Sequence, residues 1–454
     1  MRLLNAKDAT LKEFIGSNIP KYAVISHRWG EKEISYQDFI EERKSLNDIE
    51  SVSPDWGTNG WAKINAACRL ARERDLEWVW LDTCCIDKRS SAELSEAINS
   101  MFDWYQRSES CYVFLPDVDY NAETVARADV FGEEGEGMAR MRDPPTGLLP
   151  FDQDVFMKSV WFDRAWTLQE LLAPNDVRFF STSWKFLGNK NDLRPAIRQV
   201  TRIPDIFITS NDMIHKASVA ERMKWASNRQ ATRLEDNAYS LLGLFGVNMP
   251  LLYGEGNRAF LRLQTEIIRI SDDETIFGWS GKSYYHANGL LAPDLAAFSA
   301  VTDLRRQHLV PRQHYEVTNK GIRITLLLRE HLLEQAFTKS AEVRVLMLLN
   351  CADYLPAYGP GEEGPSFGIL VVLRRDMRGL HRDSKLRQMQ PVLGDRISLR
   401  PIKSVKRTVE TTNENGDTYW VVRGNDGSMG FCDLVSPAIE EDAINVPVYF
   451  STGW

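Results

Sequence analysis

Glu170 is the residue whose type and surroundings most clearly suggest chemistry. A helix predicted from about Phe156 to Leu172 places Phe162 and Trp166 on the same side as its carboxyl group. Apolar neighbours raise the pKa of a carboxyl group, which suits it to bind a sugar or to stabilise a developing positive charge. The predicted helix also carries an apolar stripe on its opposite side. The alternative is therefore a solvated glutamate on the protein surface.

A second group of chemically useful side chains follows the strand predicted at residues 22–26. In open α/β sheets, ligands bind beyond the carboxyl ends of the strands, where Ser26, His27, Arg28 and Trp29 would lie. Arg28 could pair with a pyrophosphate, and Trp29 could stack on a base. We expect His27 to be a structural histidine with its hydrogen bonds satisfied.

Two aspartates and two cysteines follow the second predicted strand. Asp82 and Asp87 could bind a ribose or a metal, but they could equally cap the following turn or form a salt bridge with Arg28. The adjacent Cys84 and Cys85 could be redox-active, although buried thiols at strand ends are more often inert packing residues.

The composition excludes several classes of protein. The 454 residues contain 55 Lys and Arg against 63 Asp and Glu, and a net charge of -8 argues against a broad nucleic-acid-binding surface. None of the 6 cysteines forms a CxxC pair, so a zinc site is not expected. The N-terminus lacks a secretory pattern, no apolar run reaches the roughly 18 residues of a membrane span, and no P-loop motif occurs. We therefore expect a cytoplasmic protein.

The elements that position these residues alternate between strands and helices. Helices are predicted at 61–74 and, after a capping box that begins at Ser90, through Tyr105. This alternation indicates βαβ units and a parallel sheet. An acidic stretch at 122–150 reads as an exposed insertion. The predicted strands of the sheet are 22–26, 77–82, 111–115 and 177–180.

The remainder of the chain predicts two further regions. Residues from about 190 to 275 are helical in pattern, with capping boxes that begin at Ser218 and Thr232 and a further helix at 257–270. From about 285, short apolar runs separated by turn formers predict an antiparallel β region. These runs begin at Gly321, Glu342, Phe367, Thr418 and Val446. The predicted domains are 1–190, 191–280 and 281–454.

Three sequence blocks resemble the fungal HET (heterokaryon incompatibility) domain, and they occur in that family's order. Residues 218–270 are similar to the helical region that follows HET domains in many fungal proteins, so the resemblance covers about residues 1–280. The blocks are YAVISHRWG at 22–30, WVWLDTCCID at 78–87 and WFDRAWTLQE at 161–170.

HET domains in turn resemble TIR domains in the order of their elements. The segment WTLQEL at 166–171 is similar to the Trp-Cys-Leu-x-Glu-Leu segment of plant TIR domains, whose glutamate is catalytic in NAD-cleaving members. The resemblance implies a TIR-like parallel sheet flanked by helices and an NAD glycohydrolase with Glu170 as its catalytic residue. The chain departs from the TIR pattern at Thr167, where that segment has Cys, and at the acidic insertion.

The resemblance implies an effector of fungal incompatibility and of innate-immunity-type cell death, which cleaves NAD at the nicotinamide–ribose bond. NAD or a related nucleotide would be the substrate, held by Ser26, Arg28, Trp29, Asp82 and Trp166, with neither cofactor nor metal. A homo-oligomer and a recognition protein are the expected partners. The alternatives are a non-enzymatic adaptor that acts through homotypic HET contacts, and a diverged HET protein whose β-rich domain does the work.

Overall fold

A computed structural model of the chain describes residues 1–16, 18–30, 32–43, 60–121, 151–279 and 291–301, residue 315, and a series of strands from residue 304 onward. The chain divides into two compact units. The first contains Met1–Lys216 and Arg229–Leu252, and the second contains Ala217–Asn228 and Tyr253–Trp454. The acidic insertion predicted at 122–150 lies outside the described residues.

The first unit is built on a sheet in the order β2-β1-β4-β3-β5-β6-β7. Its four central strands are parallel, which confirms the predicted α/β class. They are β3 (Tyr22–His27), β4 (Trp78–Trp80), β5 (Ser110–Phe114) and β6 (Val177–Phe180). Antiparallel strands that sequence reasoning missed complete the edges. They are β1 (Arg2–Asn5), β2 (Leu11–Glu13) and β7 (Phe186–Asn189).

The order of the parallel strands places a reversal at the centre of the sheet. The chain forms β3 first, adds β4 on one side, and then adds β5 and β6 on the other. Ligands of doubly wound sheets bind beyond the carboxyl ends of the strands at such a reversal. The register sets His27 at the end of β3 opposite Phe114 at the end of β5. Ser26 and His27 therefore lie at the edge where a ligand is expected.

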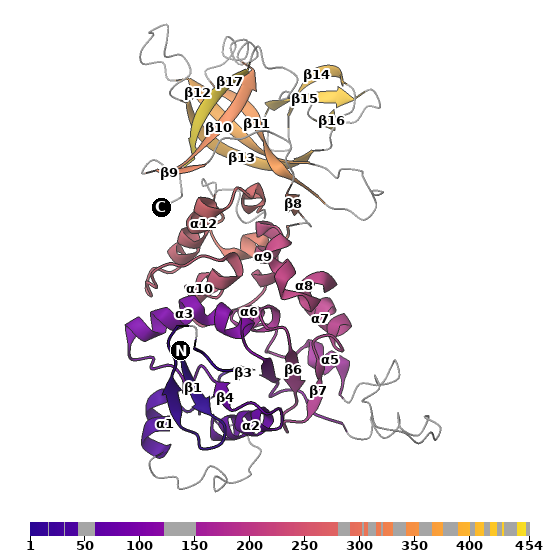
Figure 1. Ribbon diagram of the computed structural model, residues 1–454. Coiled ribbons are helices and arrows are strands. Elements are labelled where there is room, and N and C mark those ends of the chain that lie inside the picture. Colours follow the sequence, from indigo (N-terminus) through magenta and orange to yellow (C-terminus); the bar gives the residue numbers. More distant parts are fainter. Residues whose placement is uncertain are drawn as a thin grey trace, which may run out of the picture. The chain divides into compact units, whose positions relative to one another are not determined.

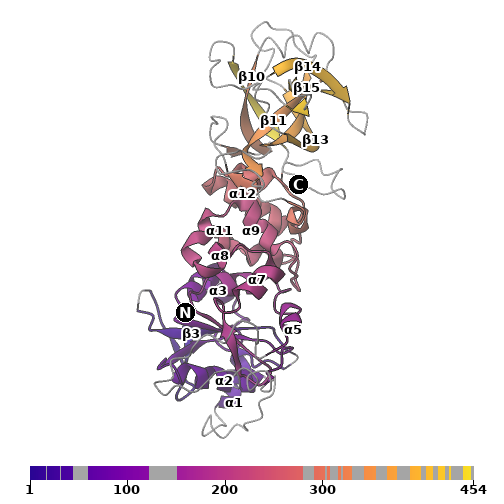
Figure 2. The ribbon, with the colours of Figure 1, turned by 90° about the vertical axis from the view of Figure 1, so that its right-hand side faces the viewer.

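Helices cover both faces of this sheet (Figures 1 and 2). On one face lie α1 (Tyr36–Arg43) and α2 (Gly60–Arg72), and on the other lie α3 (Ser91–Gln106) and α6 (Thr167–Leu172). Every residue of β3 and β5 is accordingly buried, as expected for a sheet covered on both sides. The predicted cap at Ser90 is confirmed, because its hydroxyl accepts a hydrogen bond from the amide of Glu93.

The helix predicted over Phe156 to Leu172 is wrong in its middle. The structure has α5 (Gln153–Met157) and α6, separated by a non-helical loop at residues 158–166. The backbone of Gln230 pairs with that of Asp163 and Ala165. These groups therefore find hydrogen-bond partners outside a helix, and the apolar spacing that predicted one is overridden.

Short helices complete the first unit. They are α7 (Arg194–Thr201), α8 (Asp205–Thr209), a 3-10 helix (Asn211–Lys216), α10 (Asp236–Tyr239) and α11 (Leu242–Phe245). The capping box predicted at Thr232 is wrong, because α10 begins after Glu235 without a side-chain cap.

The second unit combines helices with antiparallel strands. The helix α9 (Val219–Ala226) begins with the predicted capping box of Ser218 and Glu221, and α12 (Arg258–Ile270) corresponds to the predicted helix. The β-rich character predicted for the C-terminal region is confirmed, although the domain borders at 190 and 280 stay a prediction. The strands are β8 (Leu304–Arg306), β9 (Glu316–Thr318), β10 (Gly321–Arg329), β11 (Glu342–Asp353), β12 (Ser366–Arg375), β13 (Met389–Leu399), β14 (Val405–Thr412), β15 (Thr418–Gly424), β16 (Met429–Gly430) and β17 (Ala443–Phe450).

None of the helices that the structure describes is both long and apolar enough to cross a lipid bilayer.

Candidate functional site

Glu170 lies in the first turn of α6 and is buried against the carboxyl end of β3. Only 5% of the residue is exposed, so the alternative of a solvated surface glutamate is wrong. Its Oε2 accepts a hydrogen bond of 2.5 Å from the hydroxyl of Ser26, which is itself fully buried. The indole nitrogen of Trp161 donates to the same hydroxyl at 2.8 Å. Two of the three sequence blocks therefore meet in one hydrogen-bonded chain.

The Glu170 carboxyl group titrates near neutrality in this setting. Burial raises its pKa from 4.5 to about 7, and the negative charge of Asp82 adds to the increase. The cations Arg164 and Arg229 and the hydroxyl of Ser26 oppose the increase, because they favour the ionised form. Protonated and ionised Glu170 are thus both populated at neutral pH.

Trp29, Asp82 and Lys88 form a second group at the carboxyl ends of β3 and β4. The indole nitrogen of Trp29 donates to Asp82 Oδ2 at 2.8 Å, and Lys88 Nζ lies 3.4 Å from the centre of the Trp29 ring. Lys88 Nζ is also 3.7 Å from Asp82 Oδ2. Burial alone would raise the pKa of Asp82, but the charges of Lys88, His27 and Arg164 outweigh this effect and lower it. Trp29 is 42% exposed and held in a fixed orientation.

An ion pair between the buried Lys63 and the mostly covered Glu33 fixes the loop that carries Arg28. Lys63, which is only 2% exposed, bonds to the Glu33 carboxylate and donates to the carbonyl oxygen of Arg28 at 3.2 Å. Glu33 also accepts the amide of Gly30 at 2.7 Å. Burial works against ionisation of Glu33, but His27, Gly30 and Lys63 together lower its pKa to about 2. Sequence reasoning did not identify Glu33 or Lys63.

The structure separates the alternatives for Arg28 and His27. Arg28 is exposed and forms no ion pair with any described residue, while Asp82 pairs with Lys88 and Asp87 pairs with Arg89. The predicted salt bridge from Arg28 to either aspartate is therefore wrong. The expectation of a satisfied His27 is also wrong. The residue is 3% exposed, its Nε2 lies 3.7 Å from Glu33 Oε2, and neither ring nitrogen forms a hydrogen bond to a described residue.

The remaining predicted residues have simpler surroundings. Trp166 is half-buried at the N-cap of α6, directly before the turn that carries Glu170. Cys84 and Cys85 are buried free thiols. A hydrogen bond with Cys85, together with burial, raises the pKa of Cys84 well above its usual value, which is consistent with an inert thiol. Within the described residues, no cluster of His, Cys, Asp and Glu could hold a metal ion.

The loop at 158–166 forms contacts that sequence reasoning missed. Trp161 reads as core from its type alone, and nothing in the sequence indicates that its indole bonds to Ser26. Arg229 is 62 residues from Thr167, yet its Nη1 donates to Thr167 Oγ1 at 2.8 Å and to the carbonyl oxygen of Arg164 at 3.1 Å. Arg164 in turn donates to the carbonyl oxygen of His27 at 2.7 Å.

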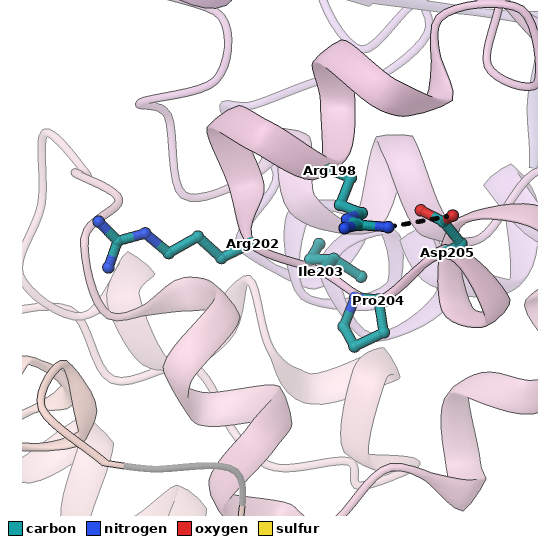
Figure 3. A pocket seen from close by; sticks show the side chains of 5 residues that line it. All are labelled: Arg198, Arg202, Ile203, Pro204 and Asp205. Atoms are coloured by element: carbon teal, nitrogen blue, oxygen red, sulfur yellow. Dashed lines mark hydrogen bonds and ion pairs between the residues drawn. The ribbon is translucent and has the colours of Figure 1, made fainter. Parts of the chain in front are cut away.

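A cavity of about 460 Å³ in the same unit involves none of the predicted site residues (Figure 3). Arg198 lies 3.5 Å from Asp205, whereas the Arg202 side chain extends away from both, so the two guanidinium groups do not converge on one point. The lining therefore has no set of charges that would hold an anion. Its residues are Arg198, Arg202, Ile203, Pro204 and Asp205.

Comparison with known proteins agrees with the sequence blocks. Residues 22–170 match the family described as Heterokaryon incompatibility protein (HET). The chain is 40% identical over 274 residues to the vegetative incompatibility protein HET-E-1 of Podospora anserina, an alignment that covers 59% of this chain and 18% of that protein. No solved structure matches the chain. The HET resemblance is thereby confirmed for the N-terminal region, while the likeness to TIR domains stays a prediction.

Proposed function

We propose that this chain acts in heterokaryon incompatibility as a cell-death effector, and that Glu170 promotes cleavage of NAD at the nicotinamide–ribose bond. The HET match of residues 22–170 and the similarity to HET-E-1 support the first part. One observation carries the second. A carboxyl group with a pKa of about 7 is buried beside Ser26, at the point where the strand order of the sheet reverses.

The chemistry requires one carboxylate rather than a pair. Nicotinamide leaves the cationic ring of NAD as a neutral base, so no general acid is needed. The ribose then develops positive charge, which an ionised Glu170 beside it would stabilise. Water adds to the ribose carbon and loses a proton, and the products are nicotinamide and ADP-ribose.

The other predicted residues then bind the rest of the substrate. Arg28, which is exposed and forms no ion pair with a described residue, pairs with the pyrophosphate, and Trp29 offers a fixed ring for a base. Asp82 lies close enough to Glu170 to raise its pKa, and it accepts from ribose hydroxyls. Trp166 forms a wall beside the carboxylate. The parallel order of the central strands supports a TIR-like domain of this kind.

Release of nicotinamide from NAD by the purified, concentrated protein tests this function. We expect Glu170→Gln to lower the rate by about 100-fold or more, because the amide cannot stabilise the positive charge. Glu274→Gln is the matched control, since it removes another buried carboxyl group, one that belongs to the second unit. A wild-type protein that releases no nicotinamide would exclude the enzymatic part of the proposal.

A non-enzymatic adaptor is the second candidate, and the low exposure of Glu170 favours it. Glu170 Oε2 already accepts a hydrogen bond from Ser26. In the adaptor, the role of the carboxyl group is then structural, and it holds α6 against β3. The fixed, exposed indole of Trp29 would then be a contact between HET domains, since such tryptophans often dominate interfaces. In that case Trp29→Ala would abolish self-association and cell death in a protein that never released nicotinamide.

A further inference from the structure

Two consecutive residues, Arg229 and Gln230, hold the loop that leads into α6. The backbone amide of Gln230 donates to the carbonyl oxygen of Asp163 at 2.6 Å, and its carbonyl oxygen accepts the amide of Ala165 at 2.8 Å. Arg229 adds the bonds from its guanidinium group to Thr167 and to the carbonyl oxygen of Arg164. The loop is thus held by both backbone and side chain from a distant part of the sequence.

Hydrogen bonds connect this loop and the start of α6 to Glu170. Thr167, which accepts from Arg229, donates its own hydroxyl to the carbonyl oxygen of Trp161 at 2.6 Å. Trp161 then donates to Ser26, and Ser26 donates to Glu170. Hydrogen bonds on the two sides of Trp161, one to its backbone carbonyl oxygen and one from its indole nitrogen, therefore connect the guanidinium group to the carboxyl group through this residue.

Arg229 also brings a buried positive charge to the site. The residue is 8% exposed, and burial lowers its pKa to about 10 against the opposing charges of Asp163 and Glu170, so it remains cationic at neutral pH. The ionisable groups that interact with Glu170 come from several elements. They are Arg229, Arg164, Asp82, Tyr105 and Cys111. Burial raises the pKa of Tyr105 and of Cys111 well above the usual values, so both are neutral near pH 7. Arg229 and Arg164 are the cations of this set.

We propose that Arg229 is a positioning residue for Glu170, because it holds the loop at 158–166 and the start of α6 in place and supplies a fixed positive charge near the carboxylate. This inference rests on the proposed role of Glu170 in NAD cleavage. Arg229 itself touches neither the substrate nor the reacting atoms.

The rate of nicotinamide release measured against pH separates this role from a merely structural one. In Arg229→Met we expect the midpoint of the acidic limb to move up by about one pH unit, because loss of a nearby cation favours protonated Glu170. Arg229→Lys should keep the wild-type midpoint but reach a lower plateau. The ammonium group retains the positive charge, but it does not reproduce both hydrogen bonds of the guanidinium group, to Thr167 and to the carbonyl oxygen of Arg164. A rate for Arg229→Met that falls equally at every pH would overturn the proposal.

Titration of the Glu170 carboxyl group, followed by infrared difference spectra between the wild type and Glu170→Gln, tests the proposal without substrate. The same spectra are recorded for Arg229→Met with and without the Glu170→Gln change. If the midpoint of the Glu170 titration is the same as in the wild type, Arg229 does not act on Glu170 through its charge. A wild type that releases no nicotinamide defeats the proposed function, whereas this titration still decides the influence of Arg229. If Arg229→Met does not fold, Arg229→Lys carries the test, and a full wild-type plateau in that variant would refute the positioning role.

Discussion

At the scale of single residues, the buried carboxyl group of Glu170 links the candidate chemistry to the stability of the fold. Its pKa is about 7 in the folded protein against an ordinary 4.5. Below pH 4.5 the group is protonated in both states and has no effect. As the pH rises from 4.5 to 7, the unfolded chain ionises first, so the free energy of unfolding falls. Above pH 7 the full loss is about 3 kcal/mol.

We therefore predict that Glu170→Gln is stabilised relative to the wild type as the pH increases. The amide can still accept from Ser26, and it does not ionise, so the loss between pH 4.5 and 7 disappears. Urea unfolding of both proteins at pH 5 and pH 8 measures the effect. The variant should gain on the wild type by about 2–3 kcal/mol between the two pH values. Parallel behaviour of the two proteins would show that Glu170 is not the group that titrates.

The sequence indicated Glu170, Ser26, Arg28, Trp29 and Asp82, because strand ends and apolar neighbours leave local signals. It could not reveal the groups that determine their environment. Lys63, Glu33 and Arg229 are charged residues that would ordinarily be solvated. Only the fold shows that Lys63 and Arg229 are buried and that the Glu33 side chain is only 11% exposed.

At the scale of elements, the sequence predicted those strands and helices whose signals are local, such as an apolar run or a capping residue. The central strands, the Ser90 and Ser218 caps and α12 all appear where the sequence placed them. The break at residues 158–166 could not be predicted, because its cause is the pairing with Gln230. Edge strands such as β2, with 3 residues, are too short to leave a periodic signal.

The packing of α11 on α3 gives a sharp prediction for two neighbouring glycines. A Cβ atom at Gly243 would lie 2.0 Å from Phe102 Cβ, which cannot move without its backbone, so Gly243→Ala should destabilise the protein by about 3 kcal/mol. Gly246 has a φ of +67° with nothing within 4 Å of the added atom, so Gly246→Ala should cost only about 1 kcal/mol of backbone strain. Thermal unfolding compares the two variants. Equal costs would mean that α11 does not approach α3 so closely.

At the scale of the whole molecule, the chain passes back and forth between its two compact units, a path that single borders such as those predicted at 190 and 280 do not describe. Residues 217–228 belong to the second unit, although the chain on both sides of them belongs to the first. The start of α9 is held by residues much later in the sequence. The amides of Val219 and Ala220 donate to Asp273 and Thr275, and the Ser218 hydroxyl donates to the carbonyl oxygen of Leu304.

A shortened chain that ends at residue 252 should therefore lose the fixed structure of α9. It lacks Asp273, Thr275 and Leu304, whereas a chain that ends at residue 306 retains all three. Limited trypsin digestion should cleave the shorter chain at Arg222 and Lys224 at least about tenfold faster, since local opening controls such cleavage. Equal resistance of the two chains would show that these bonds do not hold the helix.

The pH dependence of nicotinamide release from NAD by the wild type and Glu170→Gln tests the central claim most directly. Because only the ionised carboxylate stabilises a positive ribose, the wild-type rate should rise with pH and level off above a pH of about 7, where Glu170 is ionised. The rate of the variant should stay about 100-fold or more below the wild-type plateau at every pH. Equal release by the two proteins, or no release at any pH, would contradict the assignment of Glu170 as the catalytic residue.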